Sequence, residues 1–512
     1  MINNTQAYHP FMNHSNLRQF FRRFAALASG IVALSSLAGA AQPPTKPNII
    51  LIFADDLGWR DVGYQSEGKF LTPNIDGLAK EGMVFSSAYA GGANCAPSRA
   101  CLLSGGYTPR HGVYAVGSTD RGPKELQRLV PIPNTVGLRP EFVTLAEALK
   151  AAGYATGHFG KWHLEGESGA KPTQQGFDVS FDSFGEGAVK EGSESNQKGP
   201  PSDPKGVYTL TRKAMEFISA NTNRPFFCYL AHHGIHEPQQ SRPETRKLVA
   251  ERAKAAGVSE MYMGCTYDLD DSVGLLLARL KELNLAENTL LVFTSDNGAT
   301  PRSSQEPLRG NKGCYYEGGI REPFIVRWPG AVKAGTVCDV PVNNPDLYPT
   351  FLAAARAPVP EGAKLDGESL LPLLEQSGAL QRTAIYWHFP GYLNEPVKRG
   401  RDPVFRTRPV TVMRSGDWKL HLYHEEWQLD GGRERLATNH AVELYNLKDD
   451  IGERNDLANV NTAKRDELLD DLLAWIKSTP APLPSQANPK YAPGKQPAGK
   501  PKQRRGGEDS NE

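Results

Sequence analysis

Three stretches of the chain are continuously apolar and then turn abruptly polar. Residues 49–54 lie within "PNIILIFADDLG", and residues 290–293 lie within "NTLLVFTSDNG". A third stretch, "RPFFCYLAHHGIHEP" (224–238), ends among histidines. Apolar runs of this length, closed by polar turns, are typical of parallel strands that are covered on both faces. The pattern therefore predicts three strands of a buried, mostly parallel sheet.

Helical patterns alternate with these strands. The segment 144–163 begins with Thr144 followed three residues later by Glu147, which is the signature of a capping box. The segment 271–283 places Val273, Leu276, Leu277 and Leu280 on one helical face and leads into the second strand. Alternating strands and helices predict an α/β domain with a mostly parallel central sheet flanked by helices.

The predicted secondary structure changes in type after about residue 375. The segments 410–426 and 442–447 alternate as antiparallel strands do, and an amphipathic helix follows. The positions expected to face inward on that helix are Leu468, Leu469, Leu472 and Ile476. We therefore expect a smaller α+β subdomain with an antiparallel sheet.

These patterns divide the chain into four parts. Residues 46–375 are expected to form the larger domain and residues 376–485 the C-terminal subdomain. Residues 486–512 are rich in proline, glycine and charge, which predicts a disordered tail. A chain of 512 residues is too long for a single compact core, in keeping with this division.

Residues 1–40 have the layout of a secretory signal peptide. Arginines 18, 22 and 23 precede the apolar run 24–39, and Ala38-Gly39-Ala40 supplies a small-residue cleavage site. The run is short for a membrane span, although an uncleaved anchor remains the alternative. We expect a bacterial protein that is exported to the periplasm or cell exterior, with no stable membrane insertion after cleavage.

Charge and cysteine content exclude several classes of protein. The chain has 58 basic and 57 acidic residues, a balance that gives no support to nucleic-acid binding. Its six cysteines are too sparse for a disulfide scaffold, and none has the paired spacing of a zinc site.

Oxygen-bearing side chains follow two of the predicted strands. Asp55 and Asp56 end the first strand, and Asp296 and Asn297 end the second. In α/β sheets, ligands bind beyond the carboxyl ends of the strands. All-oxygen ligation selects Ca²⁺ or Mg²⁺ over zinc, so these four residues are candidate metal ligands. Each pair taken alone is weak evidence for a metal site, because Asp-Asp after a strand and "DNG" are common in ordinary turns.

Two sequence motifs resemble the signatures of a known family. "CAPSRACLLSG" (95–105) resembles the first signature of the type I sulfatases, and "GYATGHFGKWH" (153–163) resembles the second. The likeness covers roughly residues 46 to 480 and includes "LRGNKGCYYEGGIREP" (308–323). Ser104 stands where the family usually has threonine, and "GIHEP" (234–238) departs from the usual Ala-Pro-His-x-Pro.

The resemblance implies an alkaline-phosphatase-like fold for the larger domain and a chemical role for Cys95. In this family, a maturation enzyme oxidises the cysteine of the Cys-x-Pro-x-Arg frame to formylglycine, an aldehyde that is hydrated in the working enzyme. One hydroxyl attacks the sulfur of a sulfate ester, and the second allows sulfate to leave by elimination. An oxygen of residue 95 would join the four residues above as a ligand of Ca²⁺, with Mg²⁺ as the alternative.

The same resemblance assigns roles to the surrounding side chains. Arg99, Lys161 and Lys312 would spread the charge of the sulfate. Either His236 or Lys312 would act as the general acid, and His163 would take the proton of the second hydroxyl.

The expected substrate is a sulfated polysaccharide or oligosaccharide. His388, within "YWHFPGY" (386–392), is a candidate for contact with a sugar ring, or else a packing residue. Two other functions stay open: hydrolysis of phosphonate or phosphate diesters on the same scaffold, and non-catalytic binding of sulfated glycans.

Overall fold

The computed structural model describes residues 46–184, 199–479 and 481–493. The predicted signal peptide lies outside the described residues, so it stays a prediction. Within the described part of the chain, no helix combines the length and the apolar character needed to cross a bilayer.

The larger domain is built on an eight-stranded sheet with the order β5-β4-β6-β1-β7-β8-β2-β9. Strand β1 pairs in parallel with both β6 and β7, and β4 pairs in parallel with β5 and β6. Only β8 runs against its neighbours β7 and β2. The strands are β1 (Asn48–Ala54), β2 (Met83–Phe85), β4 (Ala155–Gly160), β5 (Val179–Phe181), β6 (Phe226–Ala231), β7 (Thr289–Ser295), β8 (Ile325–Arg327) and β9 (Thr336–Cys338).

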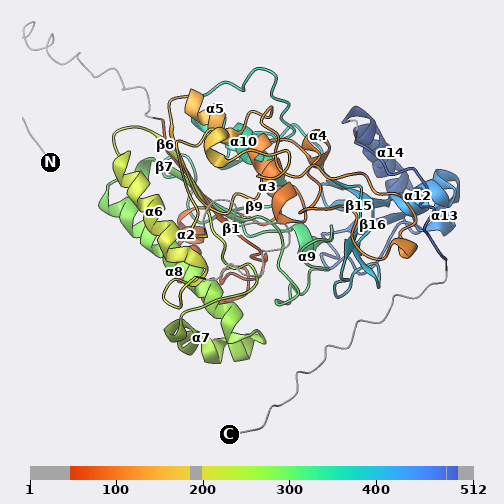
Figure 1. The fold of residues 1–512 in the computed structure, drawn as a ribbon, viewed down its shortest axis with the longest axis horizontal. Coiled ribbons are helices and arrows are strands. Elements are labelled where there is room, and N and C mark those ends of the chain that lie inside the picture. The colour runs from red at the N-terminus through yellow and green to blue at the C-terminus, as the bar shows by residue number, and fades with distance from the viewer. Residues whose placement is uncertain (1–45, 185–198, 480, 494–512) are drawn as a thin grey trace, which may run out of the picture. The chain divides into compact units, whose positions relative to one another are not determined.

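The alternation of side chains along β1 explains the three layers of this domain. Ile49 and Phe53 face a core that includes α3 (Cys95–Ser104), α5 (Leu145–Ala151) and α10 (Leu347–Ala354). Ile50 and Ile52 face a second core, formed with α2 (Pro73–Glu81), α6 (Val207–Ala220) and α8 (Glu260–Glu282). Figure 1 shows these two sets of helices on opposite faces of the sheet. Because both faces are covered, the strand is apolar at every position, as its sequence indicated.

The predicted C-terminal sheet is present and antiparallel. Its order is β11-β14-β15-β16, and its members are β11 (Ile385–Phe389), β14 (Val410–Ser415), β15 (Trp418–Tyr423) and β16 (Val442–Asn446). The last helix, α14 (Thr462–Ser478), buries the four residues expected to face inward. Residue 375 follows α11 (Leu371–Leu374) in the loop before β11. The residues from Lys46 onward form one compact unit, so the domain boundary at this position stays a prediction.

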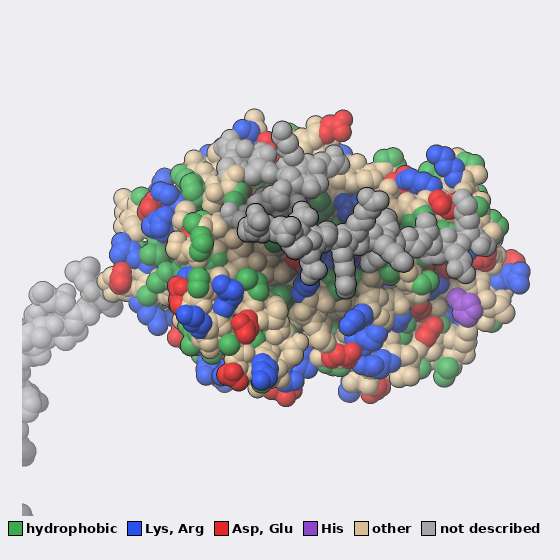
Figure 2. Space-filling view, turned by 60° about the horizontal axis from the view of Figure 1, so that its bottom comes forward, with side chains coloured by type: hydrophobic (Ala, Val, Ile, Leu, Met, Phe, Trp, Pro, Cys, Tyr) green, Lys and Arg blue, Asp and Glu red, His purple; other side chains and the backbone are tan. Residues whose placement is uncertain are grey.

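The other described elements are short or lie outside the two main sheets. The remaining strands are β3 (Ala88–Tyr89), β10 (Val342–Asn343), β12 (Leu393–Asn394) and β13 (Phe405–Thr407). The remaining helices are α4 (Thr108–His111), α7 (Pro243–Ala256), α9 (Glu317–Ile320), α12 (His424–Leu429) and α13 (Leu436–Asn439), with short 3₁₀ turns between them. Lys/Arg and Asp/Glu side chains are interspersed over the face in Figure 2, in keeping with the balanced composition.

A buried ion triad joins the C-terminal sheet to α9. Lys419 on β15 contacts Glu317 at the start of α9 and Glu453, with both N···O distances 2.9 Å. All three side chains are fully buried. The backbone amide of Glu317 also donates to a carboxylate oxygen of Glu453, at 2.7 Å. The C-terminal sheet is thereby tied to the segment that carries Lys312.

Two predictions about element bounds need correction. The helix predicted at 271–283 begins eleven residues earlier, because Ser259 caps α8 by accepting from the backbone amide of Tyr262. Residues 486–493, expected to be disordered, pair with the segment 125–130; for example, Val130 donates its amide to Gln486 at 2.8 Å. Residues 494–512 lie outside the described part.

Candidate active site

The ends of β1 and β7 bring the four oxygen-bearing residues together. The amide of Asp56 donates to Asp296 Oδ1 at 3.1 Å, and Asn297 Nδ2 donates to Asp56 Oδ1 at 2.7 Å. Asp55, Asp56, Asp296 and Asn297 are each at most 2 % exposed. The carboxyl ends of the two strands therefore converge.

Asp56 adopts the left-handed backbone conformation, with φ of 64°. This conformation is uncommon for residues other than glycine, and aspartate tolerates it better than most. The sharp turn ends β1 and lets two consecutive carboxylates, Asp55 and Asp56, enter the same site. Successive side chains of a continuing strand would instead point to opposite faces of the sheet.

Cys95 is the first residue of α3 and lies directly against these carboxylates. Its Sγ is 3.5 Å from Asp55 Oδ1 and 3.1 Å from Lys312 Nζ, and the residue is fully buried. Gly92 lets the preceding loop pack closely, because a Cβ there would lie 2.9 Å from the Pro97 side chain.

Three cations surround the same point. Arg99 Nη2 lies 2.8 Å from Asp296 Oδ2 and 3.8 Å from Asp55 Oδ1. Lys161 Nζ lies 2.8 Å from Asp55 Oδ2, and Lys312 Nζ lies 2.8 Å from Asp56 Oδ1. Arg99 is fully buried, so it belongs to the site and is not a cap exposed on the surface of α3.

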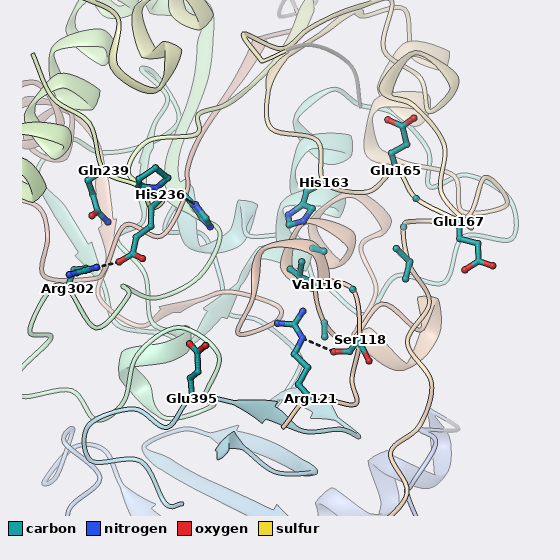
Figure 3. Close-up of a pocket in the computed structure, with 18 of the residues that line it drawn as sticks. Val116, Ser118, Arg121, His163, Glu165, Glu167, His236, Gln239, Arg302 and Glu395 are labelled. Carbon is teal, nitrogen blue, oxygen red and sulfur yellow. Dashed lines mark hydrogen bonds and ion pairs between the residues drawn. The ribbon is translucent and has the colours of Figure 1, made fainter. Parts of the chain in front are cut away.

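Two histidines complete the site. His236 Nδ1 donates to the carbonyl of Glu237 at 2.6 Å, which turns Nε2 toward Asp56 Oδ2 at 3.7 Å. His163 lines the same pocket and adopts the left-handed conformation, with φ of 59°. Figure 3 shows His163 and His236 on opposite sides of the pocket. The six residues predicted to take part in catalysis thus gather at one end of the large sheet.

The donor set fits a hard divalent cation. Asp56 Oδ2 and Asn297 Oδ1 are buried, and neither has a hydrogen-bond partner among the described residues. Ligand atoms of Asp55, Asp56, Cys95 and His236 also lie within 4.8 Å of one another. Buried acceptors without donors are costly, and a cation bound by oxygen ligands would satisfy them.

Burial and charge shift the titration of this cluster in different directions. Burial alone would raise the pKa of Asp55, but Lys161, His236 and Arg99 together hold this pKa well below its usual value. Burial, reinforced by Asp55, raises the pKa of Asp296 to about 6. Burial, reinforced by Asp296, raises the pKa of the Cys95 thiol well above its usual value. An unmodified Cys95 would therefore stay protonated and be a weak nucleophile near neutral pH.

A pocket of about 1260 Å³ opens in front of these residues. Ala96, His163 and His236 form part of its lining. On the side of His163 lie Glu165 and Glu167 (Figure 3). A substrate can therefore approach the Cys95 end of α3 between the two histidines.

The structure corrects the prediction for His388. This residue is 1 % exposed, and its two ring nitrogens lie 2.8 Å from Thr411 Oγ1 and 3.1 Å from the Pro482 carbonyl. Its ring also packs against Tyr114. The packing alternative therefore holds, because "YWHFPGY" is a buried strand of the C-terminal sheet and does not line the pocket.

Sequence reasoning missed several residues near the site. Lys205 is fully buried, and burial lowers its pKa although Cys265 and Asp55 act in the opposite direction. Glu165 and Glu167 lie on the pocket wall. None of these residues belongs to a recognisable motif, so only the fold reveals them.

Comparison with known proteins agrees with this geometry. Residues 47–357 match the family model described as sulfatase, and residues 310–478 match the model for the C-terminal part of N-sulphoglucosamine sulphohydrolase. Arylsulfatase A of Homo sapiens is 34% identical over 472 residues, covering 83% of this chain and 86% of that protein. N-acetylgalactosamine-6-sulfatase of Mus musculus is 34% identical over 428 residues, covering 77% of this chain and 75% of that protein.

A solved structure shows the same likeness. The crystal structure of Ps i-CgsB in complex with k-i-k-neocarrahexaose superposes with a TM-score of 0.68 at 30% identity, covering 86% of this chain and 95% of that chain. The matching family model spans more than half of the sequence, and the aspartates, cysteine and cations converge at one site. The chain therefore belongs to the sulfatase family and is a sulfuric ester hydrolase.

Proposed function

We propose that this enzyme removes sulfate from sulfated polysaccharides or oligosaccharides, through a formylglycine that a maturation enzyme makes from Cys95. The observation that carries the proposal is the position of Cys95, whose Sγ lies 3.5 Å from Asp55 Oδ1 and 3.1 Å from Lys312 Nζ. The hydrated aldehyde supplies one hydroxyl to attack sulfur and a second to release the sulfate.

The three cations would bind and orient the sulfate group. Lys161 forms an ion pair with Asp55, and Lys312 forms one with Asp56. Arg99 forms an ion pair with Asp296. Fixed positive charge in a site that excludes water favours the charge that develops on the sulfate oxygens. These side chains are already in place, so little reorganisation is needed during the reaction.

We assign the proton transfers to the two histidines. His236 lies at the pocket wall with its Nε2 directed into the site, where it can protonate the departing alcohol oxygen of the sugar. Lys312 is the alternative donor, at 12 % side-chain exposure. His163, on the opposite side of the pocket, is positioned to take the proton of the second hydroxyl.

We further propose that Asp55, Asp56, Asp296 and Asn297, with an oxygen of residue 95, hold Ca²⁺. The buried acceptors Asp56 Oδ2 and Asn297 Oδ1 support this assignment. The ion would lower the pKa of the hydroxyl and polarise a sulfate oxygen. Mg²⁺ is the alternative, because the same oxygen donors suit both ions.

The glycan assignment is supported by the relatives and by the pocket. N-acetylgalactosamine-6-sulfatase and the Ps i-CgsB complex with k-i-k-neocarrahexaose are both named for sugars. The pocket of about 1260 Å³ is open, and polar and apolar side chains both line it. The predicted signal peptide, residues 1–40, supports export to a bacterial periplasm or to the cell exterior. An exported enzyme would encounter sulfated polysaccharides there.

Desulfation of a panel of defined sulfated oligosaccharides tests the proposal, with aryl sulfates and aryl phosphate diesters as additional arms. We expect turnover of sulfated oligosaccharides and of aryl sulfate, and none by Cys95→Ala. Faster turnover of the phosphate diesters would favour diester hydrolysis. Binding of sulfated glycans without any turnover by the matured protein would favour a non-catalytic binder.

A further inference from the structure

Two groups of charged side chains belong to the active-site region. Arg99, Lys161 and Lys312 lie around Cys95, are mostly or fully buried and do not line the pocket itself. The charged residues that line the pocket, which we call its mouth, are in contrast mainly acidic. The charged residues that line it in the described part are Glu165, Glu167, Glu237, Glu395, Arg121 and Arg302.

Two of these acidic residues are compensated by arginines. Arg302 Nε lies 2.7 Å from Glu237 Oε1, and Arg406 Nη2 lies 3.4 Å from Glu395 Oε2. Glu165 and Glu167 are exposed and form no ion pair with any residue in the parts of the chain described. Figure 3 shows both on the side of His163, away from Arg302. Among the described residues, this wall therefore presents two carboxylates without an ion-pair partner.

The loop that carries these glutamates is held by the backbone on both sides. The amide of Leu138 donates to the Leu164 carbonyl at 2.9 Å, and the amide of Ser168 donates to the Val136 carbonyl at 3.0 Å. Between them, Gly166 has φ of 145°, and a Cβ there would lie 2.7 Å from Val136 Cγ1. The glutamates thus sit on an anchored loop, and their negative charge stays at the mouth.

The pocket is large enough for sugars next to the sulfated one to lie beside the wall that carries Glu165 and Glu167. Its volume of about 1260 Å³ exceeds the range of about 300–1,000 Å³ that is usual for drug-sized ligands. With the scissile sulfate held beside Cys95, the substituents of adjacent sugars would lie in the pocket, at its mouth. A second anionic group there would meet like charge, which disfavours binding and gives specificity by exclusion.

We propose that Glu165 and Glu167 make the enzyme selective for glycans whose sugars next to the scissile sulfate carry no second anionic group. This inference rests on the proposed glycan sulfatase function and narrows its substrate class. The preferred substrates are sparsely sulfated chains of neutral sugars. Chains that carry a sulfate or a carboxylate on the adjacent sugar are disfavoured.

The test compares two oligosaccharides that differ by one sulfate on the neighbouring sugar. For the matured enzyme at low salt, we expect kcat/KM for the singly sulfated form to be about tenfold higher, since like charges oppose association. In E165Q/E167Q, this ratio should fall by about three- to tenfold. In the parent enzyme, raising NaCl should also reduce the ratio, because salt screens exposed charges.

The matched control is E361Q/E375Q, which removes two exposed glutamates that do not line the pocket. This variant should keep the parent ratio and should hydrolyse a small aryl sulfate at the parent rate, which confirms that the control protein is correctly folded. An unchanged ratio in E165Q/E167Q, or a parent preference for the doubly sulfated form, would overturn the inference. Turnover of aryl sulfate but of neither oligosaccharide would contradict the glycan function itself, and the inference with it.

Discussion

At the scale of single residues, His236 and Lys312 are the two candidates for the general acid, and their hydrogen bonds and ion pairs distinguish them. Its Nδ1 is fixed by the Glu237 carbonyl at 2.6 Å, so Nε2 is the nitrogen that faces the site. Lys312 is already engaged with Asp56 at 2.8 Å and with Cys95 at 3.1 Å. We therefore favour His236 as the group that protonates the leaving alcohol.

Replacing His236 tests this role. For His236→Asn, we expect kcat on a sugar sulfate to fall by about 10²–10⁴-fold, the usual contribution of a general acid. An aryl sulfate with an acidic phenol should lose far less, because its leaving group needs no proton. Steady-state kinetics on both substrates measures the difference. The control is His440→Asn, at an exposed histidine outside the pocket. Equal losses on both substrates would assign His236 to binding.

The individual site residues were predictable where they belong to motifs. Cys95, Arg99, Lys161 and Lys312 lie in stretches that resemble the family signatures, and the structure brings them within contact of the predicted carboxylates. His388 was misleading because its aromatic neighbours suggested a sugar platform, whereas both ring nitrogens are engaged inside the fold. Exposure cannot be read from residue type alone.

At the scale of elements, the triad Glu317–Lys419–Glu453 holds the C-terminal sheet against the segment that carries Lys312. Lys419→Met would leave two buried carboxylates without their shared cation. Breaking a buried pair in this way costs about 3–5 kcal/mol. We expect a loss of this size in the free energy of unfolding, measured by denaturant titration.

The control for this prediction is Lys448→Met, which removes an exposed lysine from the loop after β16. Its effect should stay within about 0.5 kcal/mol, as is usual for surface substitutions. If the two variants were equally stable, the triad would have no structural role.

Helices and strands were predictable from the sequence where a single local pattern, such as a capping box or an apolar run, defines them. The capping box of Thr144 and Glu147 is present at the start of α5, and β1 is apolar because helices cover both of its faces. The first half of α8 escaped detection because polar residues such as Asp268 and Asp270 are buried there. Residues 486–493 were expected to be disordered from composition, but their backbone pairs with a distant segment. Such pairing depends on tertiary structure and leaves no local signal.

At the scale of the whole molecule, buried histidines make folding sensitive to acid. Burial lowers the pKa of His388 to about 4, against an ordinary value of 6.5. The unfolded chain therefore takes up a proton below pH 6.5 that the folded chain does not bind until about pH 4. The contribution of His388 to stability is complete above pH 6.5 and is lost as the pH falls through this window. Burial raises the pKa of Asp270 to about 7, and this group acts in the opposite direction.

The effects of His388 and Asp270 oppose one another. The test therefore compares how steeply the unfolding free energy changes with pH in the parent protein and in a His388 variant. Replacing His388 with glutamine removes one of the titrating groups. Near pH 5, the decline in unfolding free energy with falling pH should become shallower by about 1 kcal/mol per pH unit, close to the value for one proton. Urea titrations of both proteins at several pH values give these slopes. Parallel curves would contradict the assigned pKa, whatever the overall loss of stability.

The central claim is that Cys95 acts as formylglycine and not as a thiol. The most direct measurement is mass spectrometry of the peptide containing residue 95, on protein made in a host with and without the maturation enzyme, alongside sulfatase activity of the same samples. The account predicts that activity rises in proportion to the aldehyde fraction and is absent when only the thiol is present. Full activity of protein that carries an unmodified Cys95 would contradict it.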